Sequence, residues 1–221
     1  MSGILKLLNT SNEEQWLTKQ LDVYLVANNT ARTSKAVFHP SVLSNACDRY
    51  LYLHYNGLLP LQDISAQLKR IFDHGNVTQD RYQRYFENMR ILRQTEAPAK
   101  LTNPLISGRA DFIIWHKEKN ANYVIELKTI NKAGFKELAA ARDDHSTQLQ
   151  IYLNLLGIAE GGVLYECKDD QQIKLFNILR SDEKWAAIVE RCFRIMNMKK
   201  LPDTLQENHS KYCECLNVAN K

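Results

Sequence analysis

The fold is decided by two neighbouring segments, GRADFIIW at residues 108–115 and NYVIELK at residues 122–128. Both segments are rich in β-branched and aromatic residues, and the polar residues 116–121 separate them, which predicts an antiparallel hairpin. With the turn centred between Glu118 and Lys119, the strand register puts Asp111 opposite Glu126. Because side chains alternate along a strand, Lys128 lies on the same face as Glu126.

Two carboxylates at opposed strand positions repel each other unless a cation lies between them. A hard divalent ion such as Mg²⁺ resolves this conflict, because it prefers oxygen ligands and keeps several waters. We expect Asp111, Glu126 and the Leu127 carbonyl to bind it. Lys128 could then orient or deprotonate a water, or stabilise a phosphate. The alternative is a half-solvated hairpin face on which these charged residues have no functional role. The apolar neighbours instead indicate strands buried on both faces.

The rest of the chain alternates between helical and extended patterns. Helical spacing of apolar residues predicts helices over about 12–27, 40–57, 134–142, 147–158 and 182–198. Residues 63–89 form either one helix kinked near Gly75 or two helices, and residues 91–97, 161–166 and 172–179 are predicted strands. The fold class is therefore α/β (α+β), with a mixed sheet, helices packed on it and a helical N-terminal region.

The composition is typical of one globular domain and excludes intrinsic disorder as the main state. The 221 residues are 44% hydrophobic and 24% charged. We expect a single domain over 1–221, with a mainly helical region at 1–90, the sheet core at 91–180, and a C-terminal helix and cysteine-containing tail at 181–221. No apolar run is long enough for a membrane span, so we expect a cytoplasmic protein with no membrane partner. The net charge of +4 permits a polyanionic partner without requiring one.

An ordered set of motifs carries a family resemblance that covers roughly residues 41–215. Gly108-x-x-Asp111 is followed by Glu126-Leu127-Lys128, and then by Gln148-x-x-x-Tyr152 on the next predicted helix. This set resembles the PD-(D/E)xK nuclease superfamily and its RecB-like branch, which includes CRISPR-adaptation nucleases and phage and mitochondrial single-strand exonucleases. The resemblance implies a restriction-endonuclease-like mixed central sheet flanked by helices.

The same resemblance implies an activity. The expected enzyme is a deoxyribonuclease that depends on Mg²⁺ or Mn²⁺, an exonuclease that acts on single-stranded DNA or DNA ends and hydrolyses phosphodiester bonds with a metal-activated water. Asp111 and Glu126 would be metal ligands and Lys128 the catalytic lysine. Gln148 and Tyr152, one helical turn apart, would contact the DNA backbone or brace the site.

One position departs from this branch. A helix before the hairpin usually carries Gly-x-x-x-His, whose histidine is a further metal ligand, whereas Gly75-Asn76-Val77-Thr78-Gln79 has glutamine there. Gln79 can bind a metal through its amide oxygen but is a poorer ligand than imidazole. This favours a second interpretation, a nucleic-acid-binding protein on the same fold with weak or no catalysis.

The cysteines form a second group. Cys47 resembles the N-terminal cysteine that iron–sulfur members of the branch contribute to a [4Fe-4S] cluster, and Cys213 and Cys215 lie near the C-terminus. With His209 as a fourth ligand, the set suits Zn²⁺ as well as a cluster. The alternatives are free thiols in the tail, or an interaction module that a metal holds together.

Basic and aromatic residues suggest a nucleic-acid surface. The candidate contacts are Arg81, Tyr82, Arg84 and Arg109, which would combine phosphate contacts with base stacking. The expected partner is DNA, and the resemblance leaves a recombinase or a helicase open as a protein partner. A compact nuclease of this kind suits DNA recombination or repair, and a phage or mobile element acting in the host cell cytoplasm.

Overall fold

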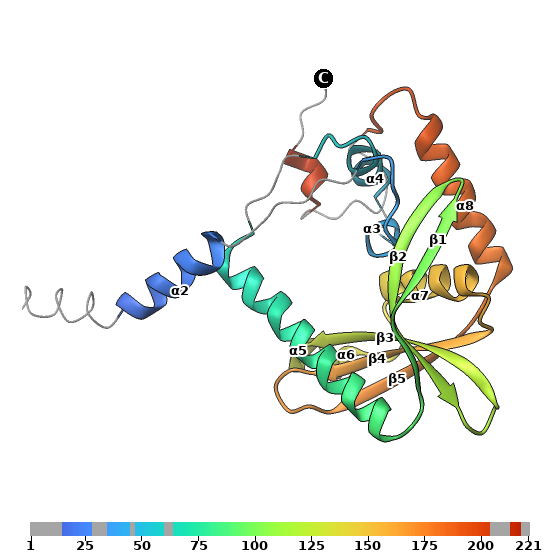
Figure 1. The fold of residues 1–221 in the computed structure, drawn as a ribbon. Helices are drawn as coiled ribbons and strands as arrows, with labels where there is room; N and C mark the ends of the chain where they lie inside the picture. Colours follow the sequence, from blue (N-terminus) through green and yellow to red (C-terminus); the bar gives the residue numbers. More distant parts are fainter. Residues whose placement is uncertain (1–14, 28–34, 45–46, 60–63, 204–212, 218–221) are drawn as a thin grey trace, which may run out of the picture. The chain divides into compact units, whose positions relative to one another are not determined.

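The computed structural model describes residues 15–27, 35–44, 47–59, 64–203 and 213–217 (Figure 1). They fall into two compact units. The described part of the first unit comprises α2 (Trp16–Ala27) and α5 (Ala66–Asn88) as far as Val77, and the second unit contains the other described residues. In the first unit Arg70 pairs with Asp22 at 2.6 Å. α5 is a single helix, so Gly75 does not divide it.

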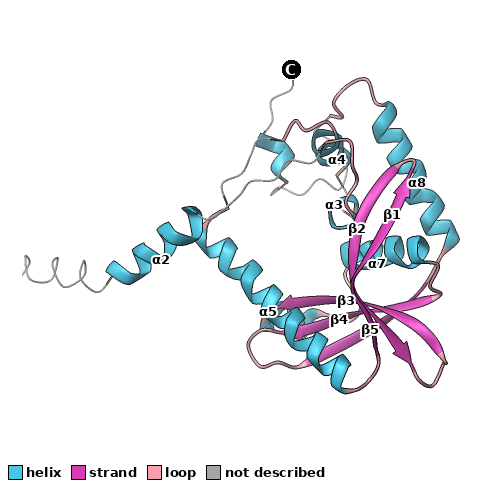
Figure 2. Ribbon diagram, viewed as in Figure 1, coloured by secondary structure: helices cyan, strands magenta, loops and turns pink. Residues whose placement is uncertain are grey.

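A five-stranded mixed sheet forms the centre of the second unit (Figure 2). Its strands, in both chain and spatial order, are β1 (Leu92–Thr102), β2 (Leu105–His116), β3 (Ala121–Ile130), β4 (Glu160–Cys167) and β5 (Ile173–Leu179). All neighbouring strands are antiparallel except β3 and β4. That parallel pair needs a crossover, which contains α6 (Lys132–Glu137) and α7 (Asp143–Leu156). Phe112 pairs with Ile125, as the predicted hairpin register requires.

Helices cover both faces of this sheet. On one face, Leu149 and Leu153 of α7 pack in a core with Val163 of β4. On the other face, the rings of Phe86 from α5 and Phe112 from β2 lie edge to face, with centroids 5.2 Å apart. The expected fold class is therefore confirmed: the chain has a mixed sheet flanked by helices, an α/β fold.

Three further helices build a core beside α7. They are α3 (Pro40–Leu43), α4 (Asp48–Tyr55) and α8 (Asp182–Asn197), and their apolar residues pack around Ile151 of α7. Asp48 joins α4 to α8 through ion pairs with Arg191 and Arg194, both at 2.7 Å. None of the helices that the structure describes is both long enough and apolar enough to cross a bilayer.

The structure changes the bounds of three predicted helices, and the one over 147–158 starts earlier, at Asp143. The predicted helix over 40–57 is divided, because Cys47 is extended and its Sγ accepts a hydrogen bond from the Tyr50 backbone, which starts α4 as a new helix. The predicted helix over 134–142 is shorter: α6 starts at Lys132, where the Asn131 side chain caps it, and ends at Glu137. Side-chain caps, from Cys47 and from Asn131, thus decide where α4 and α6 start.

Candidate active site

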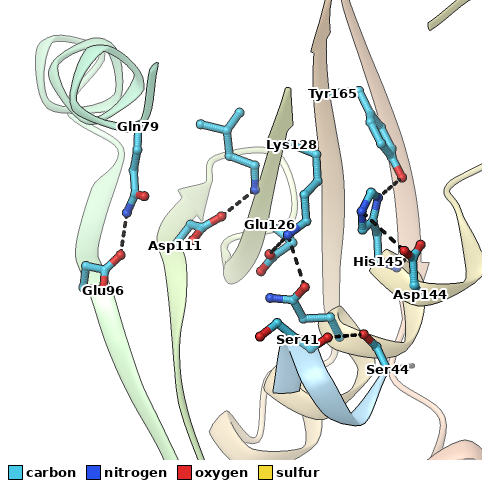
Figure 3. Close-up of polar contacts among 12 residues, drawn as sticks. Ser41, Ser44, Gln79, Glu96, Asp111, Glu126, Lys128, Asp144, His145 and Tyr165 are labelled. Carbon is cyan, nitrogen blue, oxygen red and sulfur yellow. Dashed lines mark hydrogen bonds and ion pairs between the residues drawn. The ribbon is translucent and has the colours of Figure 1, made fainter. Parts of the chain in front are cut away.

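Three carboxylates form a row across β1, β2 and β3 (Figure 3). In the β2–β3 register, Asp111 is the next position after the Phe112–Ile125 pair, opposite Glu126. In the β1–β2 register, the Thr95–Phe112 and Ala97–Ala110 pairs leave Glu96 opposite Asp111 on the other side. The backbone N–H of Leu127 donates to Asp111 Oδ2 at 2.7 Å, so the Asp111 carboxylate is held against β3.

Lys128 connects this row to α7. Its Nζ lies 2.7 Å from Glu126 Oε1 and donates to Gln148 Oε1 at 3.1 Å. Glu126 is 1% exposed, and its Oε2 is buried with no hydrogen-bond partner among the residues that the structure describes. A buried carboxylate oxygen without a partner is costly, so this oxygen is available to a ligand.

Burial and the neighbouring charges shift the pKa values of Asp111, Glu126 and Lys128. Burial, followed by the charge of Glu126, raises the pKa of Asp111 well above its usual value. Burial also raises the pKa of Glu126, although the charge of Lys128 opposes this. For Lys128 burial lowers the pKa, but the charge and hydrogen bond of Glu126 outweigh burial and the net direction is up. Asp111, Glu126 and the carbonyl oxygen of Leu127 are hard donors, and with the orphaned Oε2 they fit a hard divalent cation such as Mg²⁺ or Mn²⁺.

Tyr152 lies one helical turn after Gln148 on α7, and both side chains are buried. Burial and the charge of Glu126 raise the pKa of Tyr152, while a hydrogen bond with Gln148 lowers it. A Cβ on Gly108 of β2 would lie 3.2 Å from the Tyr152 hydroxyl and 2.7 Å from Pro40 Cδ. Glycine at position 108 thus allows α3 and α7 to approach β2 closely.

Gly108→Ala is expected to destabilise the fold by about 1–3 kcal/mol, because the new methyl group overlaps the Pro40 ring. Chemical denaturation of the variant measures this change. Gly75→Ala is the matched control, since a Cβ there meets nothing within 4 Å; alanine should stabilise the helix by about 0.5–1 kcal/mol. Equal stability of the two variants would contradict the close approach at Gly108.

Glu96 is a site residue that the sequence analysis missed. Its Oε1 accepts a hydrogen bond from Gln79 Nε2 of α5, and its Oε2 pairs with Arg109 Nε, both at 2.5 Å. Its backbone φ of 50° is left-handed, which is uncommon for a residue other than glycine and strained inside a strand. No motif marks Glu96; the available signal was its register position opposite Asp111.

A second polar group, also missed, lies beside Lys128 (Figure 3). His145 Nδ1 and the Tyr165 hydroxyl are 2.7 Å apart, and His145 Nε2 is 3.8 Å from Asp144. Burial and the charge of Lys128 lower the pKa of His145 to about 4. His145 is therefore neutral at pH 7 and adds no positive charge next to Lys128.

The predicted nucleic-acid contacts divide into two groups. Tyr82 is 7% exposed and packs in the core beneath α5, so its ring is not available to stack on a base; this part of the prediction is wrong. Arg81 pairs with the buried Glu166 and is not a free phosphate contact. Arg84 is exposed, and Arg109 is exposed at the end of the carboxylate row.

Three cysteines meet where α4 begins. The Sγ atom of Cys215 lies 3.5 Å from that of Cys47 and 3.2 Å from that of Cys213, and all three lie within 4.8 Å of one another. Burial and the neighbouring thiols raise the pKa of Cys215, so three thiolates here need a cation. The chemistry of this donor set fits Zn²⁺ or an iron–sulfur cluster. His209, the expected fourth ligand, lies outside the described residues.

Arg49 of α4 binds the backbone on either side of the residue 204–212 segment, at Pro202 and at Cys215. It is 1% exposed, donates to the Pro202 carbonyl at 2.8 Å, and reaches the Cys215 carbonyl at 3.3 Å. A buried guanidinium that binds carbonyl groups in this way fixes the chain around the cysteines. The remaining two cysteines, Cys167 and Cys192, are buried in other cores.

Comparison with known proteins gives matches in structure only. No protein-family model matches the sequence, and no curated protein matches it. The crystal structure of SSO0001 aligns with 86% of this chain and 87% of its own, at 22% identity and a TM-score of 0.52. The alkaline exonuclease LHK-Exo from Laribacter hongkongensis aligns with 80% of this chain and 90% of its own, at 14% identity and a TM-score of 0.54.

The chain has a restriction-endonuclease-like fold, a mixed sheet flanked by helices. At these identities the likeness concerns the fold, and the five-stranded mixed sheet with helices on both faces is the part that defines it. The row formed by Glu96, Asp111 and Glu126 lies within this sheet, at the positions where β1, β2 and β3 run side by side.

Proposed function

We propose that this chain is a metal-dependent deoxyribonuclease of the RecB-like branch of the PD-(D/E)xK superfamily. The observation that carries the proposal is the row of carboxylates: Glu126 is buried with an orphaned Oε2, stands opposite Asp111, and pairs with Lys128 at 2.7 Å. A fold that serves only to bind nucleic acid has no need of a buried repulsive carboxylate pair. The name of LHK-Exo, an alkaline exonuclease on a similar fold, supports the same reaction class.

Each residue of the site is proposed to have a separate role in phosphodiester hydrolysis. Asp111, Glu126 and the Leu127 carbonyl would hold Mg²⁺ or Mn²⁺, which when bound supplies Lewis-acid stabilisation of the charge on a phosphate. Lys128, as an ammonium group, can donate to the attacking water or to a phosphate oxygen. Gln148 fixes the direction of that ammonium group through the hydrogen bond from Lys128 Nζ.

Two further positions complete the site, one by bracing it and one by facing a DNA chain. Tyr152 braces β2 from α7, because its hydroxyl lies against Gly108. Arg109 is 67% exposed in its side chain and stands next to the row, where a neighbouring phosphate can meet its guanidinium. We therefore propose DNA as the substrate, with a recombinase or helicase as the class of protein partner in DNA recombination or repair.

The cysteine cluster is proposed as a second metal site with a structural task. Cys47, Cys213 and Cys215 would hold Zn²⁺ or, with further ligands, an iron–sulfur cluster. Its chemistry differs from that of the carboxylate row, because soft thiolates select different ions from hard oxygens. The cluster would fasten the C-terminal segment to the start of α4.

Exonuclease action is tested with matched linear and circular single-stranded DNA. With Mn²⁺ or Mg²⁺, we expect the linear strand to shorten progressively from an end, while a closed circle of the same sequence stays intact. Linear duplex DNA with blunt or recessed ends then distinguishes single strands from DNA ends in general. Cutting of the circle at the rate of the linear strand would identify an endonuclease instead.

The second candidate function is DNA binding with weak or no catalysis. The observation that favours it is Gln79, whose amide nitrogen is bound to Glu96 at the position where the branch usually has histidine. This candidate predicts that DNA is bound, that no metal supports more than weak cleavage, and that Lys128→Ala changes neither result.

A further inference from the structure

The hydrogen bond between Gln79 and Glu96 decides which end of the Gln79 amide is free. A carboxylate only accepts hydrogen bonds, whereas an amide has a donor nitrogen and an acceptor oxygen. The Gln79 atom that meets Glu96 Oε1 at 2.5 Å must therefore be Nε2. Gln79 Oε1, the only atom of that amide that can bind a cation, is turned away from Glu96.

Both the side chain and the backbone of Glu96 are constrained. Its second carboxylate oxygen accepts from Arg109 Nε at 2.5 Å, and its backbone adopts the left-handed φ of 50° within β1. Such a conformation is strained and persists where surrounding contacts enforce it. A residue held in this way can fix the orientation of a partner.

The pair lies at the end of the proposed metal site. Glu96 occupies the β1 position opposite Asp111, and Asp111 in turn lies opposite Glu126. Figure 3 shows Gln79 extending from α5 to the Glu96 carboxylate at that end of the row. An amide oxygen is a ligand that Mg²⁺ and Mn²⁺ accept.

We propose that Glu96 is a positioning residue that holds the Gln79 amide with its oxygen toward the divalent cation of the Asp111–Glu126 site. The Gln79–Glu96 pair thereby supplies one neutral oxygen ligand. Glu96 acts through Gln79, in the way that a carboxylate behind a metal-bound histidine fixes which ring atom faces the metal. This inference rests on the proposed function, because it needs a cation at Asp111.

The test is a double-mutant cycle with Mn²⁺ affinity as the readout, measured by calorimetry without DNA. Gln79→Ala and Glu96→Ala are each expected to weaken Mn²⁺ binding about tenfold. Because Glu96 acts through Gln79, the double variant should also lose about tenfold, and not the hundredfold expected of independent residues. Glu96→Gln keeps an acceptor oxygen for Gln79 and should retain more affinity than Glu96→Ala.

The controls separate this inference from folding and from the proposed function. Gln83 and Glu87 form an equivalent amide–carboxylate hydrogen bond on the same helix, at 2.9 Å and exposed, so Gln83→Ala should leave Mn²⁺ affinity unchanged. Thermal melting identifies any variant that is unfolded. If Glu96→Ala is unfolded, Mn²⁺ affinity is compared between the wild type and Glu96→Gln instead. Additive losses in the double variant, or wild-type Mn²⁺ affinity in both single variants, would overturn the positioning role.

Asp111→Asn distinguishes the two possible failures. If Asp111→Asn weakens Mn²⁺ binding and the Gln79 and Glu96 variants do not, only the positioning role is wrong. If Asp111→Asn also binds Mn²⁺ as the wild type does, the proposed metal site itself fails.

Discussion

Replacement of Asp111 by asparagine is expected to slow DNA cleavage by about a thousandfold or more, because it removes a charged ligand worth several kcal/mol in the transition state. The substitution keeps the side-chain shape and the acceptor for the Leu127 backbone N–H, which lies 2.7 Å away. Initial rates on end-labelled single-stranded DNA in saturating Mn²⁺ measure the effect.

The same variant should fold and bind DNA at least as well as the wild type. Burial and the charge of Glu126 oppose ionisation of Asp111, so a neutral side chain relieves a repulsion. Removing one negative charge also favours a polyanion. Asp143→Asn, which changes an exposed carboxylate at the start of α7, is the matched control and should cleave normally. Equal cleavage by Asp111→Asn and Asp143→Asn would refute the role of Asp111.

Cys47→Ser is expected to release the metal of the cysteine cluster and to lower the free energy of unfolding by about 3 kcal/mol. Serine is a strong N-cap, so the start of α4 remains capped and the loss reports on the thiolate. Elemental analysis of the purified protein gives the metal content, and chemical denaturation gives the stability.

Another buried cysteine provides the comparison for Cys47. Cys192 packs in the core between α8 and its neighbours, so Cys192→Ala should keep the full metal content. Bound zinc or iron that disappears in Cys47→Ser alone supports the cluster. A metal-free wild type that is no more stable than Cys47→Ser would show that the three thiols are held together by packing only.

The central hairpin could be predicted from sequence because its two strands are strongly patterned and its turn is short. Alternation and turn position together fixed the pairing of Phe112 with Ile125. The predicted helix over 40–57 failed for the opposite reason. Its apolar spacing continued through Cys47, whose extended backbone and Sγ cap are local features that periodicity does not register.

Some residues of the candidate site could likewise be predicted from the sequence, and others could not. Asp111, Glu126 and Lys128 followed from one register, and Gln148 was found through its motif, which the hydrogen bond from Lys128 now connects to the row. Glu96 was not found, since its role depends on a left-handed backbone and on partners from α5 and β2. Tyr82 was misread, because helical spacing alone did not tell which face of α5 packs on the sheet.

A time course of end-labelled single-stranded DNA with Mg²⁺, with Mn²⁺ and with EDTA, comparing the wild type with Lys128→Ala, tests whether this site cleaves DNA. Lys128 joins Glu126 to Gln148 without being a proposed metal ligand, so its loss should leave the cation in place and remove the donor. We expect the wild type to degrade DNA with either metal and not with EDTA, and Lys128→Ala to be slower by about a hundredfold or more. DNA that stays intact with the wild type under both metals, or equal degradation by Lys128→Ala, would contradict this expectation.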